Sequence, residues 1–155
     1  HLHREGELRV GEQTDEVEAR FESWSLPLDL KRLFQWSWPQ EYAQIGAIEW
    51  YDAESILSEG WQRRFLAESM VMIGKAGNGD ALVVRYDDAE NCPVGFVRFE
   101  AVARDRGKLV DGYYQIESSL ERFFFRAVER LYLPGDSFDC EEWAAFQRTL
   151  SSRSP

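Results

Sequence analysis

The fold is decided by the stretch MVMIGKAGNGDALVVRYDDAENCPVGFVRF, which occupies residues 70–99. It contains three apolar runs whose length and composition are typical of buried or half-buried β-strands. The runs are residues 70–74, 81–86 and 94–99. Between them lie two segments rich in Gly, Asn and Asp, residues 75–80 and 87–91, which favour turns. The spacing predicts a three-stranded antiparallel meander with short loops.

The residues before the meander predict helices and one further strand. The expected elements are a helix from Asp15 to Trp24, a helix after Pro27, a strand at residues 44–50 and a short helix that Asp52 can cap and that runs through Ser58. In the first helix, Val17 and Phe21 lie one turn apart on a single apolar stripe, and Asp15 has the spacing of an N-cap. Pro27 suits the first turn of the second helix, because its missing N–H would have no partner there.

The residues after the meander contain the strongest helical signal in the chain. This helix is expected to begin at Ser118 or Ser119, after a short extended piece at residues 113–116. Its apolar residues recur with the helical period and are Leu120, Phe123, Phe124, Ala127, Val128 and Leu131. A last helix is expected after Asp139.

The length of 155 residues suits one domain, and a chain of this size can bury a core without disulfides or metals. The elements together predict a single α+β domain with a central, mainly antiparallel sheet and helices packed around it. We expect this domain to span residues 14–150, with a flexible lead-in at residues 1–13 and a frayed tail at residues 151–155.

The charge of the chain excludes two classes of partner. There are 18 basic and 28 acidic residues, giving a net charge of -10 and a pI near 4.7. Binding to nucleic acid or to an anionic membrane needs surplus positive charge, so neither is expected. No apolar run approaches about 18 residues and no signal peptide is visible, which predicts a cytoplasmic protein. The surplus is concentrated in residues 1–60, which hold 5 basic and 13 acidic residues.

A search for catalytic, metal or cofactor chemistry finds little. The two histidines, His1 and His3, stand at a terminus, and the cysteines, Cys92 and Cys140, are far apart in sequence, so no triad, metal pair or disulfide framework is indicated. The glycine-rich segment at residues 73–80 lacks the Gly-Lys-Ser/Thr order of a phosphate-binding loop, and a strand follows it where a helix would be needed. We therefore predict no catalytic residue, no metal and no cofactor.

The aromatic residues of the first third of the chain coincide with the acidic surplus. Trp24, Trp36, Trp38, Trp50, Tyr51 and Trp61 fall within 38 residues. At least three of them are expected in the core, and the rest are of the type enriched in interface hot spots. Aromatic anchors with an acidic rim predict a surface for a basic protein partner. The alternative is that these charges only solvate helix faces and aid solubility.

Five segments follow one another in an order that is informative as a whole. They are the Leu-Pro-led helix at residues 26–34, the strand and short helix around Tyr51-Asp52-Ala53-Glu54, the glycine-rich hairpin at residues 73–84, the strand Pro93–Val97 and the Ser-x-x-x-Phe helix at residues 116–124. In this order and spacing, over about residues 24–131, the chain resembles the SUKH superfamily. That superfamily includes the fungal Smi–Knr cell-wall regulators and many bacterial immunity proteins.

The resemblance implies an α+β fold without an enzymatic motif and, in bacteria, immunity to toxins delivered between competing cells, many of them nucleases. A nuclease that grips phosphate is basic, which fits the acidity of this chain. We therefore predict a non-enzymatic binding protein, a monomer or weak homodimer, that covers the substrate groove of a basic toxin domain. The expected partner-binding residues are Glu49, Tyr51, Asp52, Glu54, Asp87, Asp88 and Glu90.

Two other functions are compatible with the same residues. One is an intracellular regulatory or scaffold module of the same fold, as in the fungal relatives. The other is a small enzyme that uses carboxylates, since acidic pairs are easily found among 28 such residues.

Overall fold

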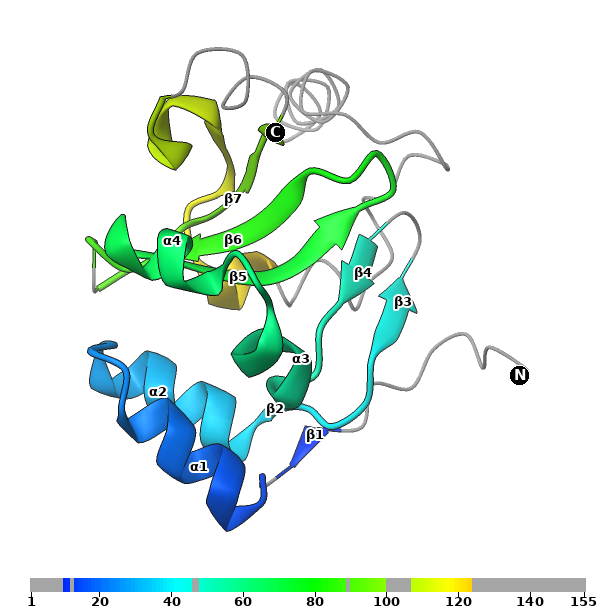
Figure 1. The fold of residues 1–155 in the computed structure, drawn as a ribbon, viewed down its shortest axis with the longest axis vertical. Helices are drawn as coiled ribbons and strands as arrows, with labels where there is room; N and C mark the ends of the chain where they lie inside the picture. Colours follow the sequence, from blue (N-terminus) through cyan, green and yellow to red (C-terminus); the bar gives the residue numbers. More distant parts are fainter. Residues whose placement is uncertain (1–9, 12, 46–47, 89, 100–106, 124–155) are drawn as a thin grey trace, which may run out of the picture.

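A six-stranded antiparallel sheet forms the centre of the molecule (Figure 1). The computed structural model describes residues 10–11, 13–45, 48–88, 90–99 and 107–123. The strands of the sheet are β3 (Ala43–Ile45), β4 (Ile48–Trp50), β5 (Met70–Ala76), β6 (Ala81–Arg85), β7 (Val94–Val97) and β8 (Tyr113–Glu117). Each strand pairs with the next one along the chain, and a separate pair joins β1 (Val10–Gly11) to β2 (Trp38–Pro39). The predicted α+β fold is confirmed.

The meander predicted from residues 70–99 is confirmed as β5, β6 and β7. Strand β5 is two residues longer than predicted, because Lys75 and Ala76 pair with β4 on their other side. The turn into β6 depends on Gly79, whose φ of 88° lies in the left-handed region that favours glycine. Its N–H donates to the Ala76 carbonyl at 2.9 Å, which closes the hairpin.

The single strand expected at residues 44–50 is wrong, because this segment forms a hairpin of two strands. Ala43 pairs with Trp50, and Ile45 pairs with Ile48. Residues 46–47, which join the two strands, lie outside the described part of the chain. The sequence carries one sign of this reversal, Gly46, which the prediction of a single strand did not use.

Among the described residues, four α-helices with both ends defined and one 3-10 helix accompany the sheet. They are α1 (Asp15–Glu22), α2 (Leu28–Trp36), α3 (Ala53–Ser58), α4 (Gln62–Ala67) and η1 (Leu109–Gly112). Asp52 caps α3 as predicted, since its Oδ1 accepts from the Ser55 N–H at 2.7 Å. The cap of α1 is Thr14 instead of Asp15, because the Thr14 hydroxyl accepts from the Val17 N–H. Helices α3 and α4 pack against β5, and α1 packs against α2 and α3 (Figure 1).

A further helix begins at Leu120, directly after Ser119. The Ser119 hydroxyl accepts from the Arg122 N–H at 3.2 Å, in agreement with the start predicted from the sequence. The remainder of this expected helix and the last helix after Asp139 lie outside the described residues, as do His1, His3 and Cys140.

Aromatic rings link the helices to the sheet in one continuous core. Phe21 of α1 stacks on Phe34 of α2 at 5.2 Å, and the contacts continue through Trp38 and Trp50 to Phe123. Such ring pairs add about 0.5–1.5 kcal/mol each beyond the area that they bury. The expectation of at least three core positions among the clustered aromatics is confirmed, because Trp38, Trp50 and Tyr51 are buried.

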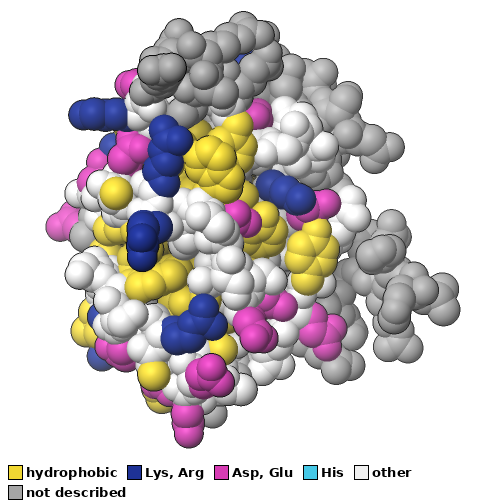
Figure 2. Space-filling model, in the orientation of Figure 1, with side chains coloured by type: hydrophobic (Ala, Val, Ile, Leu, Met, Phe, Trp, Pro, Cys, Tyr) yellow, Lys and Arg dark blue, Asp and Glu magenta, His cyan; other side chains and the backbone are white. Residues whose placement is uncertain are grey.

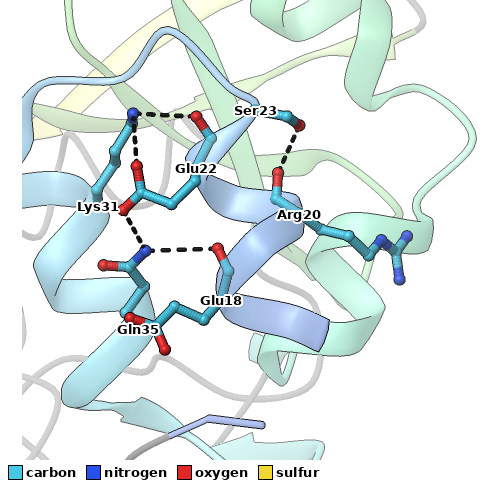
Figure 3. Close-up of polar contacts among 6 residues, drawn as sticks. All are labelled: Glu18, Arg20, Glu22, Ser23, Lys31 and Gln35. Atoms are coloured by element: carbon cyan, nitrogen blue, oxygen red, sulfur yellow. Dashed lines mark hydrogen bonds and ion pairs between the residues drawn. The ribbon is translucent and has the colours of Figure 1, made fainter. Parts of the chain in front are cut away.

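Helices α1 and α2 are also joined by polar contacts (Figure 3). The buried side chain of Gln35 donates to Glu22 Oε1 at 2.8 Å, and the Lys31 ammonium lies 3.4 Å from Glu22 Oε2. The Gln35 hydrogen bond, followed by the charge of Lys31, holds the pKa of Glu22 below its usual value. These contacts fix how the two helices lie against each other and leave Trp36 exposed at the end of α2.

The side chain of Gln62 connects three elements from inside the core. Its amide nitrogen donates to the Ile56 and Met72 carbonyls, each at 2.9 Å, and its oxygen accepts from the Met72 N–H at 2.8 Å. Strand β4 ends at Trp50, before it reaches the position opposite Met72. The Gln62 amide exchanges two hydrogen bonds with Met72 there, as the backbone of a neighbouring strand would. The register of β5 against β6 shifts next to this contact, between Met72 and Gly74.

Replacing this amide tests how far the fold depends on it. Gln62→Leu keeps the volume but leaves the Met72 backbone groups and the Ile56 carbonyl without partners, which should lower the free energy of unfolding by about 2–4 kcal/mol. Urea denaturation measures the change. The control, Gln115→Leu on the exposed surface of β8, should change it by less than about 0.5 kcal/mol. Equal stability of the two variants would contradict the role assigned to Gln62.

Candidate interaction surface

The seven residues predicted to bind a partner fall into two groups that lie far apart. The first group, on β4 and the start of α3, is Glu49, Tyr51, Asp52 and Glu54. The second group, in the turn between β6 and β7, is Asp87, Asp88 and Glu90. In Figure 1 the β3–β4 hairpin lies at the right of the sheet, whereas the β6–β7 turn lies at its left edge. The structure therefore brings together the members of each group but not the two groups.

The four residues of the first group have different surroundings. Tyr51 is buried, and Asp52 uses its carboxylate to cap α3. Glu49 forms an ion pair with Lys75 of the neighbouring strand, with 3.1 Å between Oε2 and Nζ. Glu54 is exposed in the first turn of α3. Among these four residues, Glu54 is therefore the one best placed to contact a partner directly.

Tyr42 is a surface residue that the sequence prediction missed. Its side chain is 48% exposed, and its ring stacks on Tyr51 with 6.4 Å between centroids and 27° between planes. Partial burial, followed by a hydrogen bond to Glu49, raises the pKa of Tyr42 to about 12. Burial, followed by the charge of Glu59, also raises the pKa of Tyr51. Both phenols therefore stay neutral at physiological pH and remain hydrogen-bond donors.

A sequence signal for this surface exists in the distribution of charge. From Leu33 to Gln62 the chain has five acidic residues and no Lys or Arg. The acidic residues are Glu41, Glu49, Asp52, Glu54 and Glu59. A tyrosine inside such a run is a candidate anchor because Tyr combines an apolar ring with a polar tip.

The aromatic surface continues from Tyr51 to Trp61 through Glu59. The Glu59 carboxylate bonds to Tyr51 and accepts from the Trp61 N–H at 3.3 Å. Trp61 is 44% exposed, and its ring lies 5.0 Å from that of Phe99. We call Tyr42, Tyr51, Trp61 and Phe99 the aromatic band. Figure 2 shows several hydrophobic patches on this face of the molecule, separated by polar and charged surface.

An arginine packs against Trp61, one member of the band. The Arg64 guanidinium lies 5.4 Å from the centre of the Trp61 ring, and its Nη2 donates to the Gly107 carbonyl at 3.1 Å. Cation–π contact of this kind holds an exposed indole in one orientation. Trp61 is therefore presented to solvent as a pre-oriented ring, which lowers the entropy that a partner must overcome to bind it.

The carboxylates of the second group organise their own turn. Asp87 accepts two hydrogen bonds from the Arg85 guanidinium, which in turn lies 4.9 Å from the centre of the Tyr113 ring. Asp88 accepts from the Asn91 side-chain amide at 2.9 Å. Glu90 is exposed. The partner role predicted for Asp87 and Asp88 stays a prediction, and the contacts give both carboxylates a structural role in the turn.

Three further properties of the described residues bear on function. No group of three or more His, Cys, Asp and Glu side chains within these ranges could hold a metal ion. Burial, followed by the charges of Asp88 and Asp29, raises the pKa of the Cys92 thiol, which fits a packed structural cysteine better than a reactive thiolate. No helix in the described ranges is both long and apolar enough to cross a bilayer.

The Arg85–Asp87 pair predicts a defined dependence of stability on pH. Arg85 lowers the pKa of folded Asp87 below the value of about 3.9 expected in the unfolded chain. The stabilisation is therefore present above that value and is lost as the pH falls through the folded pKa. Asp87→Asn should be less stable than the wild type near neutral pH, by a small amount because the pair is partly exposed, and the difference should vanish in strong acid.

Urea denaturation at a series of pH values measures this difference. Glu90→Gln removes the same charge from the same turn without breaking the Arg85 ion pair, so it serves as the control. A difference between Asp87→Asn and the wild type that persists unchanged below both pKa values would contradict the ion-pair explanation.

The surface thus combines an aromatic band in which Tyr42 and Trp61 are exposed, a run of acidic residues and a separate, internally paired acidic turn. Most of its members contact one another, which makes the band a defined feature of the fold and not a scatter of side chains. No protein-family model matches this chain, and no curated protein matches it either. The resemblance to the SUKH superfamily accordingly stays a prediction.

Proposed function

We propose that the chain is a non-enzymatic, cytoplasmic binding protein that neutralises a basic, nuclease-type toxin domain, as the resemblance to the immunity proteins of the SUKH superfamily implies. The observation that carries this proposal is the exposed Tyr42 ring, stacked on Tyr51 within a 30-residue segment that has acidic but no basic residues. An aromatic anchor in an acidic environment is complementary to an apolar patch that is ringed by Lys and Arg.

The two kinds of residue contribute differently to such a complex. Tyr42 and Trp61 provide large rings that are already held by neighbours, and such anchors set the dissociation rate. The exposed acidic side chains, with Glu54 as the example on α3, attract a basic partner over a distance and raise the association rate at low salt. The net charge of -10 supports this steering over the whole approach.

The β6–β7 turn contributes less to this proposal than the sequence suggested. Asp87 and Asp88 are engaged by Arg85 and Asn91, and in Figure 1 the turn lies at the left of the sheet, away from the β3–β4 hairpin at the right. Glu90 therefore provides a charge that a partner on the aromatic band does not reach. This separation gives the experiment a matched comparison within one chain.

The test uses the product of the gene adjacent to that of this chain as the candidate toxin. Tyr42→Ala should raise the dissociation constant about 10- to 100-fold, mainly through faster dissociation, because it removes an interface anchor. Glu54→Lys should slow association at about 0.1 M salt, and the effect should largely disappear at about 1 M salt. Surface plasmon resonance separates the two rates, and survival of cells that express the toxin reports neutralisation.

Two variants serve as controls. Trp36→Ala removes an exposed indole on α2, outside the aromatic band, and Glu90→Lys reverses a charge at the distant turn. Both should bind the toxin nearly as the wild type does. If Tyr42→Ala and Glu54→Lys bind and protect as well as these controls, the toxin does not use this surface. If the wild type neither binds nor protects, the function itself is refuted.

A further inference from the structure

The tip of the β5–β6 hairpin carries an Asn-Gly pair, Asn78-Gly79. Both residues are exposed, and a Cβ atom at Gly79 would meet no other atom within 4 Å. Asparagine before glycine is the pair most prone to lose ammonia, because no side chain shields the backbone nitrogen that attacks the asparagine amide. The hairpin tip therefore presents a candidate site of covalent change to solvent.

The contacts of the turn hold both reacting groups in place. The Gly79 N–H donates to the Ala76 carbonyl at 2.9 Å. The Asn78 side chain is tied to Asp80, whose N–H donates to Oδ1 at 3.0 Å and whose carboxylate accepts from Nδ2 at 3.1 Å. The Gly79 nitrogen must give up its proton and the Asn78 amide must turn towards it. Both sets of hydrogen bonds therefore have to open before the two groups can react.

The second asparagine of the chain, Asn91, provides a matched comparison. Its Nδ2 donates to Asp88 Oδ2 at 2.9 Å, and the N–H of the next residue, Cys92, donates to the Asp88 carbonyl at 2.9 Å. Cys92 has a positive φ of 47°, as Gly79 has one of 88°. The two exposed asparagines thus share a carboxylate on the amide and an engaged N–H after it. They differ in the Cys92 side chain, which shields the nitrogen that would attack.

We propose that Asn78 is a site of spontaneous deamidation, made reactive by local opening of the hairpin tip, and that Asn91 is not. In the opened turn the Gly79 nitrogen bonds to Asn78 Cγ, and the Cγ–Nδ2 bond breaks. The proton of the Gly79 N–H passes through water to Nδ2, which departs as ammonia and leaves a cyclic imide. Water then adds to either imide carbonyl and breaks one C–N bond, which yields aspartate or isoaspartate at position 78.

Either product weakens the tip of the hairpin. An aspartate places a second carboxylate where the Asn78 amide donates to Asp80, and an isoaspartate adds a carbon to the main chain of the turn. Ile48 pairs with Ala76, so the new negative charge lies close to the start of β4. The proposal does not rest on the toxin-neutralising function, but the added charge would increase the attraction of a basic partner.

Incubation of the wild type at mildly alkaline pH tests the proposal. Peptide mapping by mass spectrometry should show NH₂ replaced by OH at Asn78 and not at Asn91, with a mixture of aspartate and isoaspartate. The reaction should be about 10-fold or more slower in the folded protein than in guanidinium chloride, because only the opened hairpin reacts. Ion-exchange chromatography should show an acidic species that grows with time.

Two variants separate the chemistry from its control by the turn. Asn78→Gln keeps an amide but needs a larger ring to cyclise, so the acidic species should not form on the same time scale. Asp80→Ala removes the carboxylate that holds the Asn78 amide and should speed the reaction in the folded protein about 2- to 10-fold. In guanidinium chloride, Asp80→Ala and the wild type should react at nearly equal rates. Circular dichroism confirms that each variant is folded.

Several results would overturn the proposal. It fails if Asn91 reacts as fast as Asn78, if the acidic species persists in Asn78→Gln, or if the folded and unfolded proteins react at the same rate. It also fails if Asn78 reacts in guanidinium chloride but stays intact in the folded protein, because the hairpin tip would then not open. Equal rates for folded Asp80→Ala and folded wild type would refute the restraint assigned to Asp80. These experiments contain no toxin, so their outcome is independent of whether the toxin-neutralising function holds.

Discussion

The side-chain amide of Gln62 is the interaction on which the arrangement of the molecule depends. It bonds to the end of α3 and to both backbone groups of Met72, at the point where β4 has left the sheet. The amide therefore determines the position of α4 along β5. Trp61 and Arg64, which are one helical turn apart at the start of α4, are positioned with it. A surface feature, the pre-oriented indole, is thus determined by a buried polar contact beneath it.

Much of the fold could be predicted from the sequence, because the decisive signals are local. Apolar runs separated by turn residues identified β5, β6 and β7, and the cap at Asp52 was predicted correctly, whereas the cap predicted at Asp15 is Thr14. The β3–β4 hairpin and the role of Gln62 could not be predicted in this way. The first is marked only by Gly46, a weak turn signal on its own, and the second depends on a partner in β5 that only the folded chain brings near.

The candidate site was predicted less completely, and the reason lies in how carboxylates are used. Asp52 caps a helix, Asp87 holds Arg85, and Glu49 pairs with Lys75, so much of the acidity serves the fold. The net charge of the sequence includes these paired carboxylates and the exposed Glu54 without distinguishing between them. Tyr42 escaped notice for the opposite reason, since nothing in its own sequence neighbourhood shows that it stacks on Tyr51. The net charge of -10 therefore indicates that a basic partner is attracted from a distance, but it does not indicate which residues that partner contacts.

The order of the strands has a consequence for how the chain acquires its structure. Because every strand of the sheet pairs with the next one in the sequence, no pairing has to wait for a distant part of the chain. Topologies dominated by such short-range contacts fold faster than those with long-range pairings. During synthesis, β3 and β4 can associate while the later strands are still being translated, and each new strand then meets an edge that already exists. The sheet can therefore grow in one direction, from β3 towards β8, as the chain leaves the ribosome.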